Sequence, residues 1–338
     1  RKGVIMNILK KIGASALAGS LVAVSASAGE LSATGTWELT FKSDDNSNTG
    51  NPFGSKSAIG FSGSGDVDGV GTATWFAAIN DNSPAGFSSH QITIDMGDMG
   101  SFGFDQGVGA YGANTIDDKS PTAWEESWHN TANSSGGFTA SGGAGGVFGY
   151  TNTVAGMNLT VEYAPNLNAA DAGDGGTGAV TATADSGSNM NFAVTNATLV
   201  DGLDFGAGYG ENSSDNLSQA NTNDVTSIVG YANYTMGSAT VGITLSESSG
   251  GTAGANEVEA YGIAFNVNDN LSISYNEHNN TYKKAGAGPD VEQQATGMAI
   301  AYTMGGAKLA IQNNEMDNVK GTSGTNDEIT EVSLTLAF

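Results

Sequence analysis

The chain has 338 residues, no cysteine, five prolines and 50 glycines, and its 35 carboxylates and 11 basic residues give a formal net charge of −24. Without cysteine it cannot belong to the disulfide-stapled secreted proteins, and so acidic a surface is a poor partner for nucleic acid or anionic lipid headgroups. The glycine content alone could indicate disorder, but most of the chain alternates apolar and polar residues, as amphipathic β-strands do.

Residues 1–28 are predicted to lie outside the folded domain. Residues 1–5 have the character of upstream translated sequence before Met6, two lysines follow at positions 10 and 11, residues 12–24 are apolar or small, and residues 26–28 read Ala-Ser-Ala. This order is that of a secretory signal peptide, and the apolar run is too short for a spanning helix. We therefore expect export, cleavage after Ala28 and a single domain over residues 29–338, which keeps seven lysines, no arginine and all 35 carboxylates, a net charge of −28.

The first predicted strand covers Leu31–Phe41, where apolar or small residues occupy the odd positions and polar residues, including Glu38, the even ones. Its length is close to the 9–11 residues or so that a strand needs to cross a bilayer. After a polar loop come Lys56–Gly65 and Gly71–Asn80, joined by a short turn; Trp75 and Ile79 share the apolar face of the latter. We expect these two strands to form a hairpin.

The same pattern continues along the rest of the chain. Two short strands, 91–96 and 101–105, flank a glycine-rich turn, and two more, 146–153 and 157–163, flank another, with Glu162 on the inward phase. The remaining strands are predicted at residues 188–198, 203–210, 225–234, 239–246, 258–267, 271–276, 293–303, 307–313 and 328–338. Sixteen strands result, joined alternately by seven short turns and eight long polar loops.

An even number of strands with short turns at one end and long loops at the other is typical of an outer-membrane barrel. In lipid every backbone polar group needs a partner, which a sheet provides only by closing on itself. We therefore predict an all-β protein, a transmembrane antiparallel β-barrel of 16 strands with short periplasmic turns and long external loops. Such a barrel is wide enough for a water-filled lumen, and the strand phase assigns Glu38, Glu162 and Lys308 to the lumen wall.

The longest interruption of the alternation lies between Asp105 and Gly145. Four carboxylates occur there beside Trp124 and Trp128, namely Asp117, Asp118, Glu125 and Glu126. Long loops in compact folds are commonly functional, and the two indole rings need a surface to pack against. We expect this third loop to fold into the lumen and place the four carboxylates at the pore constriction; the alternative is a solvated surface loop. Lys42 and Lys56 are expected near the external mouth.

Two segments carry a resemblance to a known family. Residues 96–106, Met-Gly-Asp-Met-Gly-Ser-Phe-Gly-Phe-Asp-Gln, resemble the strand–turn–strand before the constriction loop of Gram-negative general porins, and Ser333–Phe338 resemble their last strand. The resemblance is closest to the trimeric porins of alphaproteobacteria. It implies a homotrimer in the outer membrane, passage of small hydrophilic solutes and ions, and recognition of Phe338 by the barrel-assembly machinery. Members usually set clustered arginines opposite an acidic third loop, and this chain has none after residue 28.

Charge itself predicts the selectivity of such a channel. Seven lysines against 35 carboxylates make the path through the lumen negative, so a cation-preferring diffusion channel is expected. A second interpretation keeps the barrel but makes it a surface receptor or structural anchor that acts through its external loops. A third, a calcium-binding β-solenoid, requires a short fixed repeat that the sequence lacks.

Other chemistry has little support in the residues. The three histidines, His90, His129 and His278, are scattered and have no cysteine partners, which argues against a zinc site. The acidic loops lack the spacing of a helix–loop–helix calcium site and allow only weak divalent binding. No nucleophile motif is present. The prediction is a protein without catalytic residues, resident metal or cofactor.

Overall fold

The computed structural model describes residues 31–45, 50–81, 88–129, 146–165, 187–213, 224–250, 255–284 and 288–338. The predicted signal peptide lies outside the described residues, as does the Gly/Ser-rich second half of the third loop, residues 130–145. Within the described part no helix has the length and apolar character needed to cross a membrane.

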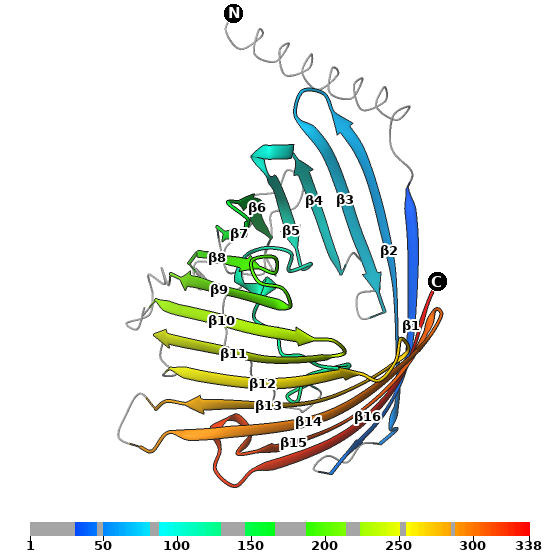
Figure 1. Cartoon of the computed structure of the whole chain (residues 1–338), viewed down its shortest axis with the longest axis vertical. Helices are drawn as coiled ribbons and strands as arrows, with labels where there is room; N and C mark the ends of the chain where they lie inside the picture. Colours follow the sequence, from blue (N-terminus) through cyan, green and yellow to red (C-terminus); the bar gives the residue numbers. More distant parts are fainter. Residues whose placement is uncertain are drawn as a thin grey trace, which may run out of the picture.

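Sixteen antiparallel strands form one closed barrel in which each strand pairs with its neighbours in the sequence and β1 pairs with β16 (Figure 1). The strands are β1 Ser32–Asp44, β2 Phe53–Val67, β3 Gly71–Asn80, β4 Ser89–Asp95, β5 Ser101–Gln106, β6 Val147–Val154, β7 Met157–Ala164, β8 Asn189–Asn196, β9 Leu203–Asn212, β10 Val225–Met236, β11 Ala239–Gly250, β12 Asn256–Asn266, β13 Leu271–Tyr282, β14 Val291–Met304, β15 Ala307–Asp317 and β16 Asn326–Ala337. The predicted fold class and strand number are therefore confirmed.

The first and last strands of the chain, β1 and β16, pair with each other and close the barrel. Thr36 on β1 lies opposite Ala337 on β16, and beyond this pair Gly35 and Phe338 exchange two backbone hydrogen bonds, at 3.1 and 2.8 Å. Closure leaves no unpaired sheet edge, so the backbone polar groups of the strands are satisfied within the sheet.

The two faces of the sheet differ in chemistry. Large apolar side chains point outward and remain exposed, as at Met298, which is 65 % exposed. The outward set on the other strands includes Trp37, Ile59, Trp75, Ile92, Phe148, Phe192, Ile228, Leu245, Ile263 and Ile311. Polar residues on the alternate positions, such as Asn191, Asn276 and Gln312, are buried inside the barrel. An apolar outside around a polar inside suits a barrel surrounded by lipid.

Several strands extend further than the hydrophobic pattern indicates. β1 continues to Asp44, β2 begins at Phe53, and Lys42 N donates to Pro52 O at 2.9 Å. Similarly, β11 continues to Gly250, so the following loop is short. The reason is that the apolar pattern marks only the outward apolar band, whereas backbone pairing requires no particular side chain and continues past it.

Candidate pore constriction

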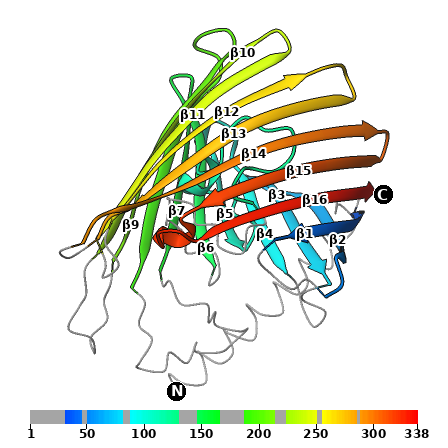
Figure 2. The same ribbon diagram turned by 90° about the horizontal axis from the view of Figure 1, so that it is seen from below.

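The chain turns inward immediately after β5. The Asp105 carboxylate accepts hydrogen bonds from Val108 N at 2.8 Å and Ala110 N at 2.9 Å, while Gly107 and Gly109 take positive φ angles of 78° and 74°. These φ values suit glycine. The turn directs residues 107–129 along the inner wall, and Figure 2 shows this teal segment inside the ring of strands.

Tyr111 fixes the start of the loop. The residue is 3 % exposed, and its hydroxyl lies 3.2 Å from Thr93 Oγ1 on β4. Its ring covers Gly149 on β6 and its hydroxyl covers Gly103 on β5, positions where any side chain would collide with it. Glycine within a strand often marks such a close approach.

The next turn, the 3₁₀-helix η2 (Gly112–Thr115), is fixed on β7 and β8. Gly112 N donates to Thr160 Oγ1 at 2.9 Å, and Ala113 N donates to Asn191 Oδ1 at 2.7 Å. Ile116 then packs with Ala193, Val229 and Tyr231 in a small apolar cluster beneath the loop. The loop is therefore packed as a core element on this side.

Glu162 on β7 does point inward, but it does not line the open lumen as predicted. It is 1 % exposed, and its carboxylate accepts hydrogen bonds from Asn114 at 3.3 Å and Asn191 at 3.0 Å. The loop covers it, so this carboxylate supports the loop instead of meeting solutes.

The second half of the described loop crosses the wall from β10 to β15. Asn233 donates to Lys119 O at 2.8 Å, Ser274 Oγ accepts from Ala123 N at 2.8 Å, and Asn276 Oδ1 accepts from Ser127 N at 2.6 Å. Asn314 Nδ2 donates to both Glu126 O and His129 O at 3.0 Å. The Trp128 and His278 rings lie 4.2 Å apart, so this tryptophan packs on the wall.

We call the inward residues that hold the loop the docking track. Its polar members are Thr160, Asn191, Asn233, Ser274, Asn276 and Asn314, and its glycines are Gly103, Gly149, Gly208, Gly242, Gly262 and Gly297. None of these residues was predicted from the sequence to hold the loop. The sequence does contain a signal for the docking track, because asparagine and glycine recur at its inward strand positions. A wall that faced only water would tolerate larger side chains at those positions.

The four predicted constriction residues all lie on the docked loop. Asp117 and Asp118 are exposed, and Glu125 and Glu126 are half-buried. The Asp118 charge acts on the Glu126 carboxyl, and Glu125 Oε2 lies 3.3 Å from His129 Nδ1. The fold thus gathers these carboxylates into one acidic surface.

Confinement raises the pKa of two of these groups. Although Asp117 has an open surface, the protein around it displaces much of the bulk water and, with the adjacent Asp118 charge, raises its pKa to about 6. Burial and the nearby charge of Asp118 also raise the pKa of Glu126 well above its ordinary value. Part of the acidic surface is therefore protonated near neutral pH.

A dependence of selectivity on pH follows from Asp117. A carboxyl whose pKa is raised to about 6 is charged above that pH and neutral below it, so the cation preference predicted from the sequence should fall as pH is lowered from about 7 to about 5. Reversal potentials in a salt gradient measure this. The Asp117→Asn variant should show a smaller change over this range; an equal change in both proteins would contradict the assignment to Asp117, whose charged neighbours are Asp118 and Lys119.

Among the described residues, β15 is the last strand that the loop contacts. The next strands around the barrel, β16, β1 and β2, carry charged residues on their inward face. Lys56 Nζ lies 3.2 Å from Glu38 Oε2, and Ser333 Oγ donates to Glu38 Oε1 at 2.6 Å. Lys42 and Glu331 lie opposite each other in the strand register. Lys56, three residues from the start of β2, thus forms an ion pair with Glu38, a contact that the sequence did not predict.

The other two predicted residues lie away from the loop. Lys308 shares the inward face of β15 with Asn314 but is next to the short turn that follows Met304, opposite Thr303 and Thr335. It therefore belongs to the entrance at the short-turn end. Phe338 lies at the same end, in the closure with Gly35.

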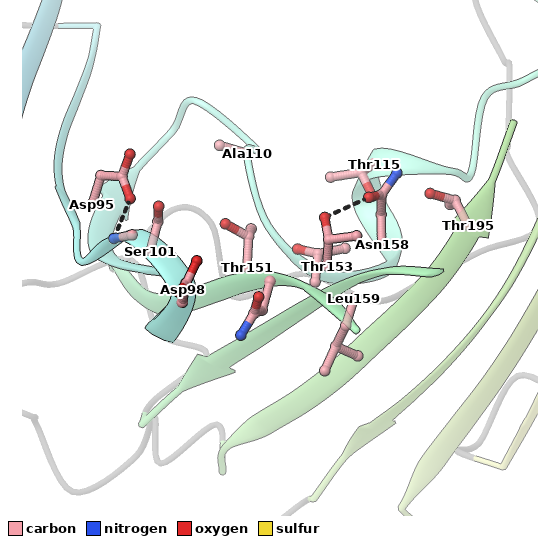
Figure 3. A pocket seen from close by; sticks show the side chains of 14 residues that line it. Asp95, Asp98, Ser101, Ala110, Thr115, Thr151, Thr153, Asn158, Leu159 and Thr195 are labelled. Carbon is pink, nitrogen blue, oxygen red and sulfur yellow. Dashed lines mark hydrogen bonds between the residues drawn. The ribbon is translucent and has the colours of Figure 1, made fainter. Parts of the chain in front are cut away.

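A polar cavity of about 720 Å³ lies on the short-turn side of the loop (Figure 3). Asp95 and Asp98 line one end, Thr115 of the loop lines the top, and the hydroxyls of Thr151, Thr153 and Thr195 line the wall. Its polar lining continues the inner surface of the barrel past the loop toward the short turns.

No protein-family model matches the chain, and a search of curated proteins finds no match. Solved structures do match it. OmpF of Salmonella typhi, in complex with daunomycin, has a TM-score of 0.66 at 14% identity, over 92% of this chain and 98% of that one. An anion-selective porin from Comamonas acidovorans has a TM-score of 0.64 at 14% identity, over 92% and 100%.

OmpT, an outer membrane protein of Vibrio cholerae, has a TM-score of 0.65 at 11% identity, over 92% of this chain and 98% of that one. At such low identities the likeness concerns the fold. The protein therefore has the porin-type fold, a closed antiparallel barrel of 16 strands.

Proposed function

We propose that this protein is an outer-membrane porin, a water-filled passive diffusion channel for small hydrophilic solutes and ions. The observation that carries the proposal is the docked loop. A closed barrel with an apolar outside and a polar inside holds an acidic segment against its inner wall by hydrogen bonds that reach from β7 to β15. A surface receptor has no need for such a device inside the barrel, whereas a channel uses it to set the width and charge of its path.

The channel is proposed to prefer cations. Asp117, Asp118, Glu125 and Glu126 form the constriction, and Glu38 on the adjacent wall adds a fifth carboxylate. Lys56 offsets Glu38, and Lys42 lies opposite Glu331. The acidic loop therefore remains the dominant charge, and a narrow low-dielectric path concentrates its field. The fold does not decide this, since one similar barrel is an anion-selective porin.

Planar-bilayer recording of the purified protein tests both statements. We expect stepwise conductance that persists across voltage, and in a salt gradient a reversal potential displaced toward the equilibrium potential of the cation. Absence of conductance from correctly folded protein would overturn the channel proposal and favour the alternative, a receptor or anchor that acts through its external loops. A reversal potential displaced toward the anion would overturn only the cation preference.

Assembly is proposed to follow the pattern of the porins that the sequence resembles, closest among them the alphaproteobacterial ones. We propose export by a cleaved signal peptide, a homotrimer in outer-membrane lipid, and Phe338 as the residue that the barrel-assembly machinery reads. No enzymatic role, cofactor or nucleic-acid partner is part of the proposal.

The trimer predicts a high-mass species in detergent gels that converts to monomer on heating. Cross-linking that yields only monomer would contradict the trimer.

A further inference from the structure

Three potential metal ligands meet at the end of the described loop. One ligand atom each from Glu125, Glu126 and His129 lies within 4.8 Å of the others. The Glu125 Oε2 to His129 Nδ1 distance is 3.3 Å. In a tetrahedral zinc site with bonds of 2.0–2.2 Å, neighbouring ligand atoms are about 3.4 Å apart. One edge of such a site is therefore already present.

The backbone that carries these side chains is held in place. His129 N donates to Glu126 O at 2.9 Å, closing the turn, and Asn314 Nδ2 donates to both Glu126 O and His129 O at 3.0 Å. Between them, Ser127 is fixed on Asn276 and Trp128 packs on His278. A ligand set on a fixed turn loses less conformational entropy when it binds an ion.

A buried amide on β15, the strand whose Asn314 holds the end of the loop, provides a second, independent observation. Gln312 is 1 % exposed and faces inward two residues before Asn314. It lies opposite Glu331 in the strand register, and the charge of Glu331 in turn interacts with that of Glu125. Both Gln312 amide atoms lack a hydrogen-bond partner within the described structure. A buried amide in that condition indicates an additional polar group, such as an ordered or metal-bound water.

The ligand types select the class of ion. Calcium takes six to eight oxygen ligands and magnesium a near-octahedral oxygen shell. One imidazole with two carboxylates instead suits zinc or a similar transition metal, which binds three protein ligands and leaves the fourth position for water. Glu38, whose charge interacts with His129, adds negative potential that favours a cation there.

We propose that Glu125, Glu126 and His129 form a binding site for a divalent transition metal, with zinc as the representative ion and Gln312 as the partner of a metal-bound water. The site is on the acidic loop, so the added charge would reduce cation flow; this consequence rests on the proposed channel function. Metal binding itself does not depend on that function.

Titration of the full-length protein in detergent with zinc chloride, followed by calorimetry, tests the site. We expect His129→Asn to weaken zinc binding by about tenfold or more, since loss of partners outside the coordination sphere already costs 10–100-fold. Glu125→Gln should act in the same direction. His90→Asn is the matched control, because His90 lies on β4, outside the ligand cluster, and should leave zinc binding unchanged.

Bilayer recording gives the second readout. Zinc should lower the cation current of the wild-type channel, and His129→Asn should require about tenfold more zinc for the same effect. Magnesium at equal concentration should not distinguish the two proteins. Equal zinc affinity in wild type and His129→Asn, or a magnesium effect with the same dependence on His129, would overturn the site. Zinc binding that depends on His129 in a protein without conductance would retain the site and overturn the channel proposal.

Discussion

Replacing Asp117 and Asp118 with asparagine and Glu125 and Glu126 with glutamine is expected to lower the cation-to-anion permeability ratio by about tenfold at low salt. At an effective dielectric constant of about 20, a unit charge about 10 Å from an ion changes its energy by roughly 1.7 kcal/mol. A tenfold change in the ratio needs about 1.4 kcal/mol, so losing a little less than one effective charge suffices. The charge that the four substitutions remove is smaller than four elementary charges, because raised pKa values leave Asp117 and Glu126 partly neutral.

The measurement is the reversal potential in a salt gradient, repeated at higher ionic strength, where screening should reduce the difference. A matched control removes four carboxylates from outward strand positions, with Glu211, Glu247, Glu259 and Glu292 changed to glutamine. Both variants change the formal net charge by the same amount, but only the loop variant changes the lumen. Unchanged selectivity in the loop variant would move the filter to the wall, most directly to Glu38.

Substituting Gly297→Val is expected to displace the end of the loop and to lower the mean conductance with larger open-channel noise. A Cβ at position 297 would lie 2.5 Å from Asn314 Oδ1 and 2.7 Å from Ser127 Cα. Carbon atoms pack at about 3.5–4.0 Å, so the loop backbone must retreat toward the lumen by about 1 Å or more. Overpacking of this kind costs about 1–3 kcal/mol.

That cost is comparable with the interactions that hold the loop end. Three hydrogen bonds, from Ser127 N to Asn276 and from Asn314 to Glu126 O and His129 O, contribute about 0.5–1.5 kcal/mol each. Single-channel recording measures the result. Gly230→Val is the matched control, because the nearest atom to a Cβ there is Gly206 O at 3.7 Å, an ordinary contact. Identical current traces from the two variants would show that Gly297 does not determine the loop position.

The sequence by itself determined the barrel. Alternating side chains point to opposite faces of a strand, so a period-two pattern fixes which residues face lipid and which face the lumen. The regular succession of short turns and long loops fixes the antiparallel order of the strands. The sheet must also close, because an open edge in lipid would leave backbone polar groups without partners. Strand number and the inward phase of Glu38, Glu162 and Lys308 followed from these local rules. Strand ends did not, because backbone pairing continues past the apolar band.

Only the tertiary structure decided what lies inside the barrel. The loop has no periodicity, and its path is set by contacts between residues far apart in the chain, such as Asn314 with Glu126, 188 positions away. Local pattern carries no information about such pairs. For this reason the burial of Glu162 beneath the loop and the hydrogen bond from Asn314 to His129 O were not predicted. Each of these contacts depends on how the irregular loop packs against side chains from several strands. The pattern within a single strand does not contain that information.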